Sequence, residues 1–114
     1  MTKQINSEQT IGNLTRGQLE EIKHKLNQNF DQIKQQYQIK QLGIFGSYIR
    51  GEATENSDLD ILVEFEPQAR FGLLTFCELE NHLSELLAVK VDLVMKDGLK
   101  PQIGKNILQE VVYL

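Results

Sequence analysis

Two short segments of this chain largely alternate between apolar and polar side chains, and the polar side of each includes aspartate. In residues 59–65 every second side chain is apolar, while Asp60 faces the other way together with Asp58, just before the segment. Residues 89–95 alternate in the same manner, with Asp92 among the polar positions. Because successive side chains of a strand point to opposite faces, each segment predicts a β-strand with one face in the core. A sheet that contains both strands then presents aspartates on its other face.

Two longer segments carry apolar residues at the spacing of an α-helix. The first starts at Thr15, which forms a T-x-x-Q capping box with Gln18, and continues for about six turns at roughly 3.6 residues per turn. Its apolar stripe consists of Leu19, Ile22, Leu26, Phe30, Ile33 and Tyr37. The stripe of the second helix consists of Leu73, Phe76, Leu79, Leu83, Leu86 and Leu87. We expect both helices to cover the apolar face of the sheet.

The remaining segments complete the order of elements. Residues 39–45 predict a strand that runs into Gly46, and residues 52–57 predict a loop. Pro101 suits the first turn of a short helix, and residues 111–114 can add an edge strand. The predicted fold class is α/β (α+β), with a small mixed β-sheet, helices packed on one face and an open aspartate face.

The three aspartates form the first candidate site. Asp58 and Asp60 are two positions apart, so their side chains leave the same face with Cα atoms roughly 7 Å apart. Asp92 lies on the corresponding face of the later strand. Two carboxylates at ~4 Å repel by about 1 kcal/mol in water and by about 4 kcal/mol at an effective dielectric of 20. A cation offsets this repulsion, and hard oxygen ligands favour Mg²⁺, with Mn²⁺ as the alternative.

A second candidate site lies just before the first in the chain. Gly46 lets the backbone approach a phosphate closely, and Ser47 adds a hydroxyl to the exposed N–H donors of the turn. Arg50 can neutralise charge that develops on phosphate oxygens, or it can position the loop instead. A phosphate cradle and a metal cradle therefore occur close together in the sequence.

The stretch from Gly46 to Asp60 resembles the Gly-Ser, ten-residue spacer, Asp-x-Asp signature of the DNA polymerase β-like nucleotidyltransferase superfamily. Its internal Arg-Gly and Ser-Asp-Leu-Asp elements match too, and residues 91–94 look like the strand that carries the third carboxylate of that family. The resemblance runs over residues 15–114. In size and layout the chain is similar to the minimal nucleotidyltransferases, the MNT antitoxins that are paired with HEPN ribonuclease toxins.

The resemblance implies a role for each matching position. Asp58 and Asp60 would bind the catalytic metals, two Mg²⁺ ions, and Asp92 would bind one metal and help to activate the acceptor hydroxyl. Gly46 and Ser47 would hold the β- and γ-phosphates of ATP. In HEPN–MNT pairs the acceptor is a tyrosine of the toxin, and adenylylation silences its RNase activity. The resemblance thus implies a Mg²⁺-dependent protein adenylyltransferase that moves AMP from ATP onto a HEPN toxin and releases pyrophosphate.

Two other functions compete with this one. A binding-only antitoxin would mask its toxin by contact, and degenerate acidic residues would favour it, yet all three aspartates are present. A small-molecule nucleotidyltransferase of the aminoglycoside-modifying type generally carries an added helical domain, for which 114 residues leave no room. The protein-modifying enzyme is therefore the leading hypothesis.

Composition narrows the classes of partner and location. The net charge is −4, which argues against direct nucleic-acid binding because such proteins normally show a basic excess. A single cysteine excludes an intramolecular disulfide framework. No apolar run approaches the ~20 residues that span a membrane, and residues 1–13 lack the apolar segment of a secretory signal. We expect a cytoplasmic protein with one nucleotidyltransferase domain at residues 14–114 and a flexible N-terminal tail at residues 1–13.

Overall fold

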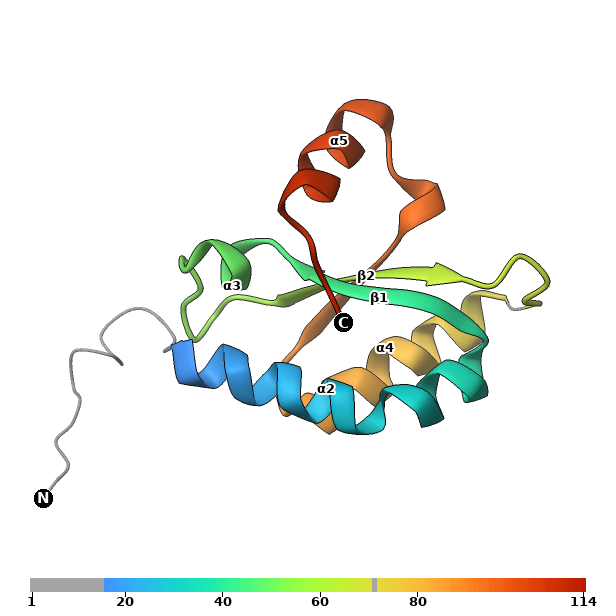
Figure 1. The fold of residues 1–114 in the computed structure, drawn as a ribbon, viewed down its shortest axis with the longest axis horizontal. Coiled ribbons are helices and arrows are strands. Elements are labelled where there is room, and N and C mark those ends of the chain that lie inside the picture. Colours follow the sequence, from blue (N-terminus) through green and yellow to red (C-terminus); the bar gives the residue numbers. More distant parts are fainter. Residues whose placement is uncertain (1–15, 71) are drawn as a thin grey trace, which may run out of the picture.

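A mixed four-stranded β-sheet forms the centre of the molecule (Figure 1). The computed structural model describes residues 16–70 and 72–114, so the predicted tail at residues 1–13 and the capping residue Thr15 lie outside the described residues. The strands are β1 Ile39–Phe45, β2 Leu59–Phe65, β3 Val91–Met95 and β4 Val112–Tyr113. The helices are α2 Arg16–Tyr37, α3 Ser47–Arg50, α4 Leu73–Leu87 and α5 Pro101–Glu110, with a 3₁₀ turn η1 at Lys96–Gly98. The predicted fold class and order of elements are confirmed.

The strands lie in the order β3-β2-β1-β4. Strand β1 is antiparallel to both β2 and β4, whereas β2 and β3 are parallel. Because parallel neighbours need a crossover connection, α4 carries the chain from β2 to β3. The predicted edge strand near the end of the chain is present as β4, in which Val112 pairs with Ile44 and Tyr113 with Gly43.

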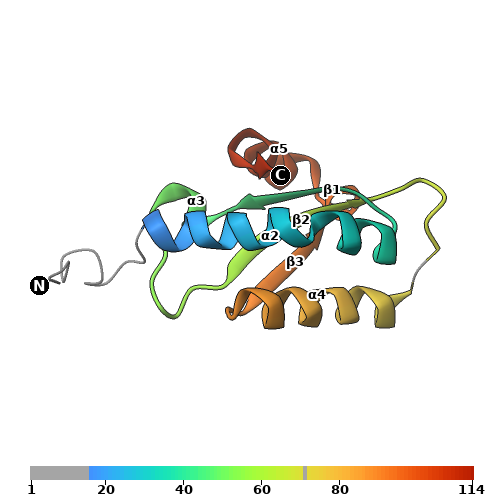
Figure 2. The same ribbon diagram turned by 60° about the horizontal axis from the view of Figure 1, so that its bottom comes forward.

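Helices α2 and α4 lie side by side on one face of the sheet, and α5 lies on the other side (Figures 1 and 2). The two helical stripes meet the apolar face of the strands in a single core. Its fully buried members include Leu26, Ile33, Ile44, Leu59, Ile61, Leu79 and Leu83. The predicted covering of one face therefore holds for α2 and α4, and the aspartates of β2 and β3 lie outside this core.

Two details differ from the sequence-based expectation. Leu73 was expected on the buried stripe of α4, but its side chain is 78% exposed. Ten residues separate Leu73 from the buried Leu83, which turns its side chain roughly 80° around the helix from the centre of the stripe. Strand β3 begins at Val91 instead of residue 89. Ala88 adopts the left-handed conformation at the end of α4, and the N–H of Val89 still donates to Ser84 O at 3.3 Å.

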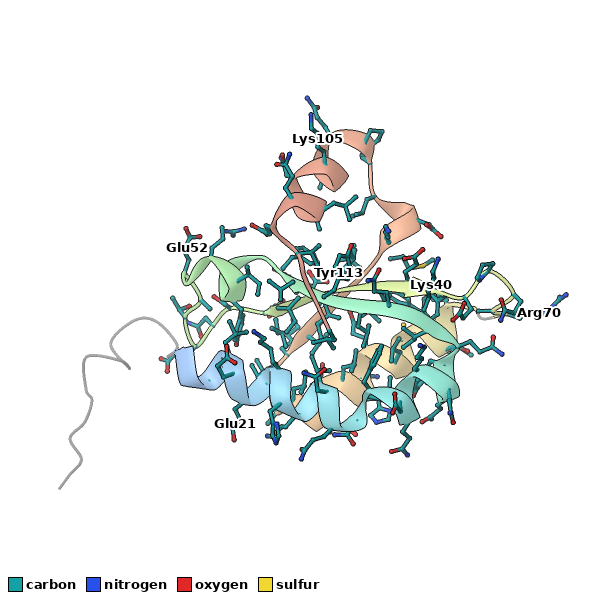
Figure 3. The ribbon with its side chains drawn as sticks, viewed as in Figure 1. Glu21, Lys40, Glu52, Arg70, Lys105 and Tyr113 are labelled. Atoms are coloured by element: carbon teal, nitrogen blue, oxygen red, sulfur yellow. The ribbon has the colours of Figure 1, made fainter. Side chains whose placement is uncertain are left out.

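Helix α5 begins at Pro101 as predicted, and it leaves apolar side chains in contact with solvent. Ile103 is 55% exposed and Leu108 is 43% exposed. Lys105 projects from this helix away from the sheet (Figure 3). None of the helices in the described ranges combines the length and the apolar character that a membrane span requires.

Candidate active site

Gly46 forms a tight turn between β1 and α3 that no other residue type fits. Its φ of 83° and ψ of −153° lie in a region that is essentially restricted to glycine. A Cβ atom built on Gly46 would collide with Oδ2 of Asp60. The turn therefore packs its backbone directly against a carboxylate of β2, and Ser47, the next residue, begins α3. The two cradles predicted from the sequence are adjacent in space.

The pairing of β2 with β3 brings the predicted carboxylates together. Asp60 and Asp92 are directly opposite each other in the parallel register, so their side chains leave the same face of neighbouring strands roughly 4.8 Å apart. Asp58 precedes β2 by one position and acts electrostatically on Asp60. Asp58 and Asp60 are partly buried, whereas Asp92 is exposed. All three aspartates thus contribute negative charge to one region beside the Gly46 turn.

The electrostatic consequence is largest at Asp60. Its pKa is raised to about 6, first because burial removes water from the carboxylate and then because Asp92 and Asp58 lie nearby. Glu110 raises the pKa of Asp60 further, whereas the charge of Arg50 lowers it. A carboxylate whose ionised form is disfavoured in this way is stabilised by any cation that binds beside it.

Arg50 is held by two carboxylates. Its Nε donates to Glu52 Oε1 at 2.9 Å, and its Nη1 donates to both carboxylate oxygens of Glu110 at 3.1 Å. These partners raise the pKa of Arg50. Of the two roles that the sequence left open for Arg50, these contacts support positioning of the loop.

Glu110 is a site residue that sequence reasoning missed. Besides its contact with Arg50, its Oε2 accepts a hydrogen bond of 2.7 Å from the N–H of Gly46. Glu110 is the last residue of α5 and stands more than sixty positions away from Gly46. No motif or spacing marks it, because only the pairing of β4 with β1 brings this part of the chain to the turn.

The donor set suits a magnesium ion. Among the described residues, no group of three histidine, cysteine, aspartate or glutamate side chains is arranged to hold a metal ion, so the three aspartates do not form a preassembled metal site. Mg²⁺ does not demand such a site, because it keeps several waters and is usually bound by one or two carboxylates together with substrate phosphates. Asp60 and its register partner Asp92 supply two hard oxygen donors of that kind, and their charge is poorly compensated by the protein.

Asp60→Asn is expected to raise the melting temperature in the presence of EDTA by several degrees. The substitution removes a disfavoured negative charge, and about 1 kcal/mol shifts the melting temperature of a domain of this size by roughly 4–8 °C. Added Mg²⁺ is expected to stabilise the wild type and to have a smaller effect on the variant. Thermal denaturation by circular dichroism measures both effects. Asp31→Asn on the exposed side of α2 is the control, and an equal Mg²⁺ shift in all three proteins would contradict the expectation.

A hollow of about 390 Å³ borders Asp58, but neither Asp60 nor Asp92 lines it. Asp58, Tyr48 and Lys90 are among its lining residues. Burial and the charge of Asp58 raise the pKa of the Tyr48 hydroxyl, which therefore stays protonated and able to donate a hydrogen bond. The hollow thus leaves room for a polar group next to Asp58.

Comparisons with known proteins agree with this geometry. A family model described as nucleotidyltransferase domain matches residues 20–114. Protein adenylyltransferase MntA of Thermococcus cleftensis is 49% identical over 96 residues, which cover 84% of this chain and 95% of that protein. A solved structure of a minimal nucleotidyltransferase matches with a TM-score of 0.71 and 35% identity over 84% of this chain and 95% of that one.

A more distant structural match is to a complex of a tri-AMPylated HEPN toxin of Shewanella oneidensis with its MNT antitoxin. It has a TM-score of 0.58 and 18% identity, and it covers 81% of this chain and 70% of the matched chain. At this identity the match establishes a shared fold.

Proposed function

The chain belongs to the nucleotidyltransferase-domain family as a homologue of protein adenylyltransferase MntA, and from this premise we propose that it is an antitoxin that adenylylates its toxin. The reaction transfers AMP from ATP to a hydroxyl group of the partner and releases pyrophosphate. The partner is a HEPN-family ribonuclease, the acceptor is a tyrosine, and the modified ribonuclease is inactive.

One observation carries the proposal: Asp60 lies opposite Asp92 in the parallel register, and Asp60 also packs against the turn at Gly46. The carboxylate of Asp60 then belongs both to the proposed metal-binding region and to the proposed phosphate-binding region. A surface strand whose aspartates merely face water has no need of a glycine turn packed on one of them. The 49% identity to a protein adenylyltransferase supports AMP as the transferred group and a protein as the acceptor.

Asp58, Asp60 and Asp92 would hold magnesium in this proposal, as the family resemblance implies. Bound magnesium supplies positive charge that neutralises the triphosphate and makes the acceptor hydroxyl easier to deprotonate. The turn at Gly46 and Ser47 would hold the β- and γ-phosphates through the serine hydroxyl and the backbone N–H groups that follow Gly46, whose own N–H donates to Glu110. These contacts leave the α-phosphate next to the carboxylates.

Asp92 would guide the acceptor, because it is the most exposed of the three aspartates. The oxygen of the acceptor hydroxyl forms a bond to the α-phosphorus, and the bond from that phosphorus to the bridging oxygen of the β-phosphate breaks. The hydroxyl proton passes to Asp92 or to water, and pyrophosphate leaves. A phenol has a pKa near 10, so this assistance is needed at neutral pH.

We expect this protein to transfer label from labelled ATP to its HEPN partner in the presence of Mg²⁺. A HEPN-family ribonuclease is the acceptor to be tested, and mass spectrometry identifies the modified residue. Replacing that tyrosine by phenylalanine is expected to remove the label, because a phenyl ring has no hydroxyl to attack the α-phosphorus. Label retained on another residue type would contradict the tyrosine assignment.

The same assay separates the two alternative functions. A binding-only antitoxin would neutralise the ribonuclease without labelling it, and Asp58→Ala/Asp60→Ala would neutralise it equally well. A small-molecule enzyme would label an aminoglycoside in preference to the protein. Under the proposed function the double variant neither labels the ribonuclease nor neutralises it lastingly.

A further inference from the structure

Glu110, near the end of the chain, contacts the residue before α3 and the last residue of α3. Its Oε2 accepts a 2.7 Å hydrogen bond from the N–H of Gly46, which precedes the helix. Both of its carboxylate oxygens accept from Nη1 of Arg50, the last residue of the helix, at 3.1 Å. The Glu110 side chain is 25% exposed, and its contact with Gly46 is partly buried, whereas its contacts with Arg50 are exposed. A single carboxylate therefore contacts both ends of the proposed phosphate cradle.

Helix α3 cannot fix its own orientation. It has four residues, which is about one turn, and a helix of this length is unstable without tertiary contacts. Its entry point, Gly46, packs against Asp60 on one side and is hydrogen-bonded to Glu110 on the other. Loss of the Glu110 contact would free the N–H of Gly46 and one end of the Arg50 guanidinium together.

We propose that Glu110 is a positioning residue for nucleotide binding, which fixes the Gly46 turn and the Arg50 side chain before ATP arrives. This inference rests on the proposed function, because it assumes that the turn receives the triphosphate. Donors that are already in place bind a phosphate group more tightly than donors that must be ordered during binding. Hydrogen bonds to an ionised carboxylate are also among the stronger ones in proteins.

A competing interpretation is that Glu110 occupies the phosphate position and is displaced by ATP. The backbone argues against displacement. Glu110 lies two residues before Val112, and Val112 pairs with Ile44, which lies two residues before Gly46. The N–H of Leu114 also donates to Leu42 O at 3.0 Å. The same pair of strands therefore keeps the backbone of Glu110 next to Gly46, and the carboxylate can leave only by rotation of its own side chain, which gives up its hydrogen bonds to Gly46 and Arg50 together.

The chain offers a matched control for the test. Glu52 also binds Arg50, at 2.9 Å from its Nε, but no contact joins it to Gly46 in the described residues. It lies at the outer edge of the molecule beyond α3 (Figure 3), and its side chain is 64% exposed. Glu110→Ala removes both contacts, and Glu110→Gln keeps a neutral acceptor for the Gly46 N–H. Glu52→Gln removes only the charge of an outer partner of Arg50.

The experiment measures the KM and kcat of the full chain for MgATP with the HEPN partner, and the amide resonance of Gly46 by NMR without ATP. For Glu110→Ala we expect KM to rise about tenfold or more, kcat to fall less than KM rises, and the Gly46 amide proton to move upfield. Glu110→Gln is expected to fall between this variant and the wild type. Glu52→Gln is expected to leave the Gly46 resonance in place and KM within about twofold of the wild type. Melting temperatures measured alongside show that each variant is folded.

Two outcomes would overturn the inference. If KM is the same in Glu110→Ala and Glu52→Gln, the carboxylate does not position the cradle. If KM falls in Glu110→Ala, the carboxylate competes with the triphosphate instead. A wild-type protein that transfers no AMP would refute the proposed function separately. In that case the Gly46 resonance and the affinity for MgATP measured by calorimetry still decide the role of Glu110.

Discussion

Exchanging Asp60 for asparagine is expected to lower the rate of AMP transfer about a hundredfold to a thousandfold while the protein stays folded. Loss of one group that stabilises developing charge typically has an effect of this size. Asp60 is the carboxylate that links the two halves of the site, because it packs on the Gly46 turn and lies opposite Asp92. Asparagine has nearly the same shape, so the substitution removes charge with little change in packing. Single-turnover transfer of labelled AMP measures the loss.

Glu64→Gln is the matched control for this substitution. Glu64 lies on the same face of β2, four positions further along the strand, and it pairs with Lys40 and Lys96 instead of facing the other aspartates. Both lysines are at least one third exposed, so losing these pairs costs little stability. Transfer by Glu64→Gln is expected to stay within about twofold of the wild type. An equal loss in both variants would mean that general negative charge on this face matters, and not the site at Asp60.

Gly46→Ala is expected to abolish AMP transfer and to lower the free energy of unfolding by roughly 2–4 kcal/mol. Part of the loss arises because the backbone conformation of Gly46, with φ at 83° and ψ at −153°, is strained for any residue with a side chain. The rest arises because the new methyl group collides with Oδ2 of Asp60 and must displace either the turn or the carboxylate. Urea denaturation and the transfer assay measure the two effects.

Gly51 separates these two causes. It also has a positive φ, 75°, but a Cβ atom built on it would meet nothing within 4 Å. Gly51→Ala therefore carries backbone strain alone, about 1 kcal/mol, and is expected to keep most of the activity. If Gly51→Ala lost as much activity as Gly46→Ala, strain in the loop would explain the result and contact with Asp60 would not.

Local periodicity was sufficient to predict the elements and most of the candidate site. Alternation over residues 59–65 placed Asp58 and Asp60 on the polar side of a strand, and the structure has that strand at those residues. The Gly46 turn was also predictable, because glycine followed by serine at the end of a strand is a local signal. Such signals need only neighbouring residues.

The parts that could not be predicted depend on contacts between distant segments. That Asp92 lies directly opposite Asp60 is set by how α4 packs against the sheet, and alternation in β3 indicates a face but not a register. Glu110 was harder still to predict, since nothing near it in sequence distinguishes it from other surface glutamates. The exposure of Leu73 has a different origin, because its offset of roughly 80° around the helix from the buried Leu83 follows from the helical spacing itself.

The strand order also has a consequence for protein synthesis. The hairpin of β1 and β2, with the Gly46 turn, Asp58 and Asp60, can form early as the chain leaves the ribosome. Asp92 follows only after α4 has been made, and Glu110 arrives just before β4 pairs with β1. A nascent chain therefore acquires Asp92 late, and the contact of Glu110 with the Gly46 turn forms last. An incompletely translated copy lacks this contact and so lacks the complete candidate site.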